Sequence, residues 1–181
     1  MTLGLEFPSI IAAARTGAEW AWVAIYTDLA GPITAYLTSQ GAQEPEDLTS
    51  ETFLQAARDI SSFEGNERGF RSWLFVIAHR RLVDSWRAAG RRPQITSELD
   101  GSFEPLGGDT EEEAIERLVE GELLQAFARL TDDQRALLAL RIMGNLTLAE
   151  TAMVLGRSLG AVKVLQRRAV LALKKMLDDQ T

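Results

Sequence analysis

Residues 146–163 read LTLAETAMVLGRSLGAVK, a pattern that predicts two short helices joined by a tight turn. Ala152 is small enough to let two helices approach, and Gly156 follows four residues later, where the turn needs a positive φ. Ser158 can cap the second helix, and Val162 can lock that helix against the first. This is the spacing of a helix–turn–helix unit.

The second helix of this unit has two unlike faces when it is wound at about 3.6 residues per turn. Its apolar face carries Val162, Leu165, Ala169 and Ala172. Its other face carries Gly160, Lys163, Val164 and Arg167. A face that is small at its start and basic beyond is suited to the major groove of duplex DNA. The alternative is a helical hairpin whose basic face is only solvated.

Helical signals fill most of the remaining chain, and strand signals are absent. Three capping boxes are expected, in which Ser or Thr is followed three residues later by Glu or Gln: Thr110 with Glu113, Thr131 with Gln134, and Thr147 with Glu150. In the first half, helices are predicted over residues 19–28, 32–39, 45–60 and 70–89, with Pro32 and Pro45 in first turns. The fold class predicted from the sequence is all-α.

The segment 93–109 has the composition of a linker, because it contains two Pro and three Gly and lacks a helical period. We therefore expect two small helical domains, residues 1–92 and 112–181, joined by an acidic flexible linker over residues 93–111. The net charge of the 181 residues is -7, which argues against nucleic-acid binding. The charge is unevenly distributed, however: residues 68–92 hold seven Arg and one acid, whereas residues 93–122 hold ten acids and one base.

Several classes of function are excluded by composition. The chain has no Cys and one His, His79, so thiol chemistry and clusters of His or Cys metal ligands are excluded. It contains no run of 18 apolar residues and no signal-peptide pattern, so we expect a cytoplasmic protein without membrane insertion. We find no phosphate-binding loop and no nucleophile with a base, and we therefore expect no enzyme activity and no cofactor.

A loop that opens a helix at residues 61–78, SSFEGNERGFRSWLFVIA, is the second informative stretch. One face of this helix is expected to be core and carries Phe70, Trp73, Leu74, Ile77 and Ala78. A second stripe carries Phe75, His79, Leu82 and Trp86, with Arg71, Arg80, Arg81 and Arg87 around it. Aromatic rings interleaved with Arg favour unpaired bases, because rings stack on bases while Arg neutralises phosphate. The alternative, equally supported for Phe75 and Trp86, is a helix buried on two sides.

Together these stretches resemble the extracytoplasmic-function (ECF) sigma factors of bacterial RNA polymerase. Residues 47–54, DLTSETFL, are similar to the family's region 2.2, and residues 70–84, FRSWLFVIAHRRLVD, to regions 2.3 and 2.4. Residues 130–141, LTDDQRALLALR, and the helix–turn–helix are similar to region 4. On its own, the segment 47–57 is an acidic amphipathic helix with a solvated face. Three motifs in this order are far more specific than any one of them.

The resemblance implies a role for each matching position. The family's helix that contacts the β′ clamp of core polymerase corresponds to Asp47, Ser50, Glu51, Phe53 and Ala57. The loop at Phe63, Gly65 and Asn66 would hold a base flipped from the -10 element, and the non-template strand would be contacted by Arg71, His79, Arg80 and Arg81. The -35 element would be read by Arg157, Ser158, Gly160, Lys163, Val164 and Arg167.

The implied partners are core polymerase through its β′ clamp and β flap, promoter DNA, and an anti-sigma factor. Ser50, Arg80 and the pair Val164-Leu165 depart from the usual family residues, which leaves the promoter sequence open. Two alternatives explain less of the chain. A stand-alone helix–turn–helix regulator accounts only for the second domain, and a sigma-like decoy that binds its partners without melting DNA rests only on the departures.

Overall fold

The computed structural model describes residues 3–90 and 123–178. These segments consist of helices, turns and loops without a strand, as the sequence predicts. The elements are η1 (Gly4–Glu6), α1 (Phe7–Arg15), α2 (Glu19–Ser39), α3 (Pro45–Asp59), η2 (Ile60–Ser62), α4 (Glu67–Ala88), α6 (Asp132–Ile142), α7 (Leu148–Leu155) and α8 (Leu159–Asp178), and residues 123–128 are also helical. The predicted linker and the capping box at Thr110 lie outside the described residues.

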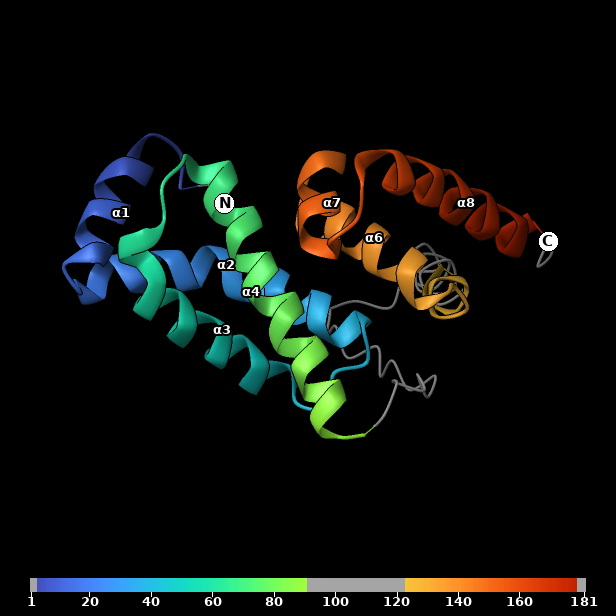
Figure 1. The fold of residues 1–181 in the computed structure, drawn as a ribbon, viewed down its shortest axis with the longest axis horizontal. Helices are drawn as coiled ribbons and strands as arrows, with labels where there is room; N and C mark the ends of the chain where they lie inside the picture. Colours follow the sequence, from blue (N-terminus) through green and yellow to red (C-terminus); the bar gives the residue numbers. More distant parts are fainter. Residues whose placement is uncertain (1–2, 91–122, 179–181) are drawn as a thin grey trace, which may run out of the picture.

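Helix α4 is the centre of the molecule, with α3 on one side of it and α7 on the other (Figure 1). It is buried around most of its circumference: Phe70, Leu74, Phe75 and Leu82 all have zero exposure. At its N-terminal end, the ring of Phe70 packs against Phe63 and Trp73 with centroids 5.1 and 5.5 Å away. A helix that is buried on several sides needs apolar residues on each of those sides. This explains why the sequence of α4 shows two apolar stripes.

The first domain differs from the sequence-based prediction in two elements. The sequence divides α2 at Pro32, but the structure shows one helix of 21 residues with Pro32 inside it. An interior Pro loses one backbone hydrogen bond. The helix continues because one face, with Ile25, Leu29, Ile33 and Leu37, is at most 2% exposed. Helix α1 was not predicted, although its Phe7, Ile10, Ile11 and Ala14 are buried in the core.

The helix–turn–helix forms as predicted from residues 146–163. Thr147 and Glu150 form both bonds of a capping box at the start of α7, and Thr131 and Gln134 do so at α6. Gly156 ends α7 in the left-handed region with φ 61°. Ser158 Oγ accepts a bond from the Ala161 amide at 3.2 Å. Val162 is fully buried in a cluster that also holds Leu137, Leu138, Ala152 and Ala169.

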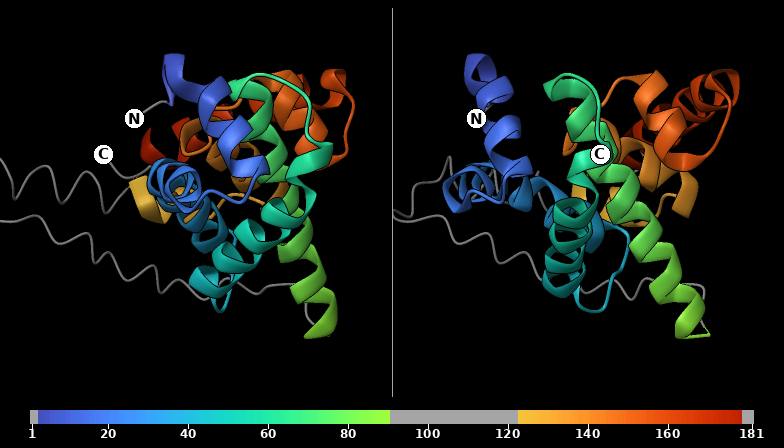
Figure 2. Two further views of the ribbon diagram at one scale, coloured as in Figure 1. Left: turned by 90° about the vertical axis from the view of Figure 1, so that its left-hand side faces the viewer. Right: turned by 60° about the vertical axis from the view of Figure 1, so that its left-hand side comes forward.

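The second domain packs directly against the first. The main core cluster runs from α1 to α4 and continues into the second domain through Ala139, Leu140, Leu146 and Val154. Figure 2 shows α6 and α7 beside α4 and α2 from two further directions, and contacts between α4 and α7 and between α2 and α6 agree with those views. The two helical units expected from the sequence therefore share a packed face.

Candidate nucleic-acid and polymerase interfaces

The start of α8 presents an exposed face that carries the residues predicted for the -35 element. Gly160, Lys163 and Arg167 are exposed, and Val164 is 52% exposed. The predicted -35 residues therefore lie together at one end of the helix–turn–helix, opposite buried Val162. Two of the set also have structural contacts: Ser158 caps α8, and Arg157 pairs with Asp133 at 2.6 Å. Because the Arg157 pair is solvent-exposed, it contributes little to stability and leaves the guanidinium able to exchange partners.

The predicted -10 residues on α4 divide between several directions. Arg71 points into the domain, where it pairs with Asp28 of α2 at 3.2 Å and its side chain is 14% exposed. Arg81 points toward α3 and donates to Gln55 Oε1 at 2.7 Å. Arg80 is exposed. The structure thus does not gather the four basic or imidazole side chains into one cluster.

His79 is half-buried beside Tyr36, whose hydroxyl lies 2.7 Å from its Nδ1. Burial lowers the pKa of His79 below its ordinary value of 6.5, and burial raises the pKa of the Tyr36 hydroxyl well above its usual range. The imidazole is therefore neutral near pH 7 and adds no positive charge for a phosphate. It can still present a polar edge along the exposed part of α4.

The loop before α4 has a polar contact at each end: Arg15 of α1 donates to the Phe63 carbonyl, and Asn66 bonds within the first turn of α4. Asn66 Oδ1 accepts the Gly69 amide at 2.9 Å, so this side chain caps α4. The ring of Phe63 is 6% exposed and lies under Gly65, whose φ is 153°. A Cβ at Gly65 would come within 3.1 Å of that ring, so glycine fits the close approach. Gly65 and Asn66 remain exposed, and the Phe63 ring lies beneath Gly65.

An apolar groove of about 500 Å³ runs between α2 and α3. From α3 it is lined by Ser50, Phe53, Leu54 and Ala57, and from α2 by Trp22, Val23 and Tyr26 among others. Leu54, Val23 and Tyr26 are 60%, 57% and 47% exposed, which is unusual for apolar side chains gathered in one place. Three residues predicted for polymerase binding, Ser50, Phe53 and Ala57, thus share a surface suited to a protein partner. Asp47 and Glu51 lie on the same helix α3, outside that lining.

The sequence-based prediction missed the α2 side of this groove. Trp22, Val23 and Tyr26 belong to a predicted helix, and nothing local distinguishes a groove wall from a core face. The signal that could have found them is an excess of large apolar residues on both sides of α2. For Phe75 the sequence left open whether the ring faces unpaired bases or the core. The structure places it in the core, at zero exposure.

Family models match both halves of the chain: Sigma-70 region 2 covers residues 26–92, and Sigma-70, region 4 covers residues 126–175. The chain is 32% identical over 137 residues to the ECF RNA polymerase sigma factor ShbA of Streptomyces griseus. The aligned residues make up 74% of this chain and 72% of ShbA. The chain belongs to the ECF sigma factors. It is also 33% identical over 172 residues to BldN of Streptomyces coelicolor, covering 94% of this chain and 65% of BldN.

Two solved structures share the fold. CnrH in complex with the cytosolic domain of CnrY aligns with a TM-score of 0.66 at 22% identity, covering 95% of this chain and 97% of CnrH. RpoE of Bartonella quintana, in complex with the anti-sigma factor NepR, aligns with a TM-score of 0.62 at 22% identity, covering 84% and 94%. Among the described residues of this sigma factor, no helix is long and apolar enough to span a membrane, and no group of acids and His could hold a metal.

Proposed function

We propose that this chain is a dissociable, non-catalytic subunit that directs core RNA polymerase to promoters. One observation carries the proposal: an exposed apolar groove on one unit and an exposed basic helix start on the other occur in one chain. The α3 wall of the groove lies within matched region 2, and the helix start lies within matched region 4. A DNA-binding regulator alone has no use for the groove. A decoy has no use for a correctly capped recognition helix.

The groove between α2 and α3 is the proposed seat of the β′ clamp. Its exposed rim residues, Leu54, Val23 and Tyr26, supply the apolar contact. The acidic side chains of Asp47 and Glu51 on α3 can pair with basic residues of the partner, Glu51 by exchanging its exposed ion pair with Arg81, 3.8 Å away. Tyr26 packs on Phe53 with ring centroids 4.8 Å apart, so the groove floor is already formed before binding. A preformed apolar site of this kind lowers the ordering cost of association.

Promoter recognition is proposed to use α8 for the -35 duplex and the loop and exposed side of α4 for the -10 strand. Gly65 lies over the Phe63 ring and exposed Asn66 follows it at the start of α4, where a flipped base could be held. Opening the duplex costs a few kcal/mol per unstacked step, and base capture offsets that cost. By analogy with the complex of RpoE and NepR, we also propose that an anti-sigma factor binds this chain.

Run-off transcription with core polymerase from the source organism tests the proposal. We expect a promoter-dependent transcript with the chain and none with core polymerase alone. Leu54→Glu, in the groove, should weaken core binding at least tenfold, because it places a charge in an apolar contact. Leu5→Glu is the matched control, because Leu5 is fully exposed and lies outside the groove. No transcript combined with no core binding would exclude the sigma function.

A further inference from the structure

The short turn before α1 reaches the first turn of α4 (Figure 1). The Leu3 and Gly4 amides donate to the two carboxylate oxygens of Glu67, at 2.8 and 3.0 Å. A carboxylate that accepts backbone amides forms charge-assisted bonds, which are about twice as strong as bonds between neutral groups. Glu67 is partly buried, so water competes only in part for these bonds. The start of α4 is therefore attached to a segment that lies 64 residues earlier in the chain.

A second polar contact joins the other end of α1 to the same region. The Arg15 guanidinium, in the last turn of α1, donates to the Phe63 carbonyl. Between the two contacts, the ring of Phe7 packs against Phe70 with centroids 5.8 Å apart, and Phe70 packs in turn on Phe63. One N-terminal segment, residues 3–15, thus holds both ends of the loop that opens α4.

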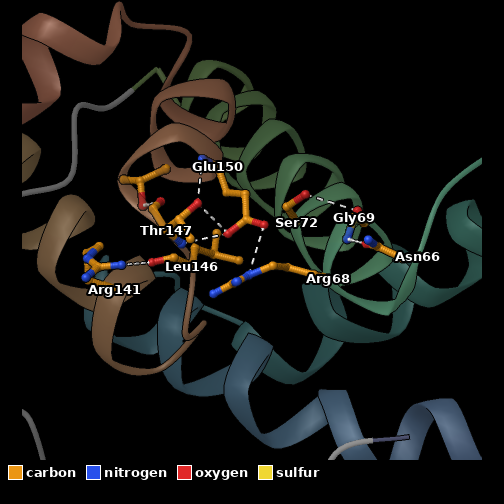
Figure 3. A network of polar contacts seen from close by, with 9 residues as sticks. Asn66, Arg68, Gly69, Ser72, Arg141, Leu146, Thr147 and Glu150 are labelled. Atoms are coloured by element: carbon orange, nitrogen blue, oxygen red, sulfur yellow. Dashed lines mark hydrogen bonds and ion pairs between the residues drawn. The ribbon is translucent and has the colours of Figure 1, made fainter. Parts of the chain in front are cut away.

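The first turn of α4 has further bonds of its own (Figure 3). The Gly69 amide donates to Asn66 Oδ1 at 2.9 Å, and the Gly69 carbonyl accepts from Ser72 Oγ at 3.0 Å. These bonds fix the turn that follows the loop. Glu64, inside the loop, is exposed, and no described residue bonds to its carboxylate. Of the two acids in this region, only Glu67 therefore connects the loop to the N-terminal segment.

The loop held in this way is the one proposed to capture a base flipped from the -10 element. Its geometry is tight, because a Cβ at Gly65 would come within 3.1 Å of the Phe63 ring. A small shift of either end of the loop would change the space available to a base. We propose that Arg15 and Glu67 are positioning residues for base capture, which keep the loop in its binding shape before DNA arrives. This inference rests on the proposed promoter function and adds the N-terminal segment to the parts that serve it.

The sign of the effect separates positioning from simple electrostatics. DNA is a polyanion, so loss of an acid should by charge alone tighten binding. Positioning predicts the opposite for Glu67, whose loss should weaken binding. An Arg that neutralises a phosphate lowers the salt slope by about one when it is removed. Positioning predicts that removal of Arg15 weakens binding and leaves the salt slope unchanged.

The test is binding of holoenzyme to a fluorescein-labelled single strand with the non-template -10 sequence of a promoter that is transcribed in the run-off assay. A second set of strands carries one abasic site, at each position in turn. The captured base lies where an abasic site weakens binding of the parent most. The ratio of the abasic to the intact dissociation constant at that position measures capture. We expect a ratio of at least about fivefold in the parent, because stacking of one base contributes about this factor.

Glu67→Ala should lower that ratio at least threefold and leave the affinities for the abasic strand and for core polymerase unchanged. Glu64→Ala is the matched control, because it removes the same charge from the same loop, and it should keep the ratio. Arg15→Ala should lower the ratio as Glu67→Ala does. Since Arg15 is exposed, its variant tests positioning even if circular dichroism shows that Glu67→Ala misfolds.

An unchanged ratio in either folded variant, or an equal fall in Glu64→Ala, would overturn the proposal. Equal losses of affinity for the intact and abasic strands would do the same, because base capture is then not what the variant changes. A salt slope lowered by about one in Arg15→Ala would instead make Arg15 a phosphate contact. If no abasic site weakens binding of the parent, the loop captures no base and the inference fails. Run-off transcription is measured separately, so this failure is distinguishable from failure of the sigma function.

Discussion

Gly156 and Gly160 lie four residues apart in the helix–turn–helix, and substitution of each by Ala should change stability in opposite directions. Gly156 ends α7 with φ 61° and ψ 34°. Gly160 lies in the first turn of α8 and is exposed. An added Cβ would meet nothing within 4 Å at either position. Steric overlap with neighbours is therefore absent in both, and only the conformational terms differ.

Those terms can be estimated from the backbone alone. An L-residue in the left-handed region costs about 1–2 kcal/mol, and Ala recovers about 0.4–1 kcal/mol by restricting the unfolded chain. Gly156→Ala should therefore lower the free energy of unfolding by about 1 kcal/mol. In a helix Ala is more favourable than Gly by about 0.5–1 kcal/mol, so Gly160→Ala should raise it by about 0.5 kcal/mol in a first turn.

Urea unfolding followed by far-ultraviolet circular dichroism measures both values. Gly160→Ala carries a second expectation, because its methyl group would stand on the face proposed to enter the major groove. We expect this variant to be more stable and yet to bind the -35 element severalfold more weakly in holoenzyme. A Gly156→Ala protein as stable as the parent would refute the assigned turn geometry. A more stable Gly160→Ala protein with unchanged -35 binding would refute the assigned DNA face.

Three further outcomes follow from single side chains. Lys163→Ala with Arg167→Ala should weaken -35 binding by holoenzyme and lower its salt slope by about two, measured by titration at several salt concentrations. His79 has a lowered pKa, so the unfolded chain takes up its proton first, and the free energy of unfolding should fall as pH drops below about 6.5. Urea midpoints at about pH 7 and about pH 5 should differ more for the parent than for His79→Gln. Pro32→Ala should raise the free energy of unfolding by about 1–2 kcal/mol, since an interior Pro costs about 3 kcal/mol and restricts the unfolded chain.

Local signals were sufficient for the helix–turn–helix. The Thr147 capping box, the left-handed Gly156 and the buried Val162 all depend on residues within one or two turns of each other, so spacing alone determines them. The exposed start of α8 follows from the same periodicity. Helical periodicity is therefore enough to place Gly160, Lys163 and Arg167, three of the residues predicted for the -35 element, on one surface.

Long-range pairing explains what could not be predicted. The sequence predicts that the Arg71 side chain contacts the non-template DNA strand. In the structure, it is turned into the domain by its hydrogen bond to Asp28, which lies 43 residues away in the chain. The sequence predicts that a helix starts at Pro32, whereas the structure shows Pro32 inside α2. The local pattern could not show this, because α2 is kept continuous by a face buried against α3 and α4. In both cases a local preference was outweighed by packing that the sequence does not display as a pattern.

The sequence left two interpretations of Phe75 open, one as a core residue and one as a residue facing unpaired bases. In the structure Phe75 is fully buried, and part of its cover comes from Gly144 of the second domain. The structure therefore supports the interpretation as a core residue. The sequence could not decide between the two, because the residue that closes over the ring lies 69 positions away in the chain.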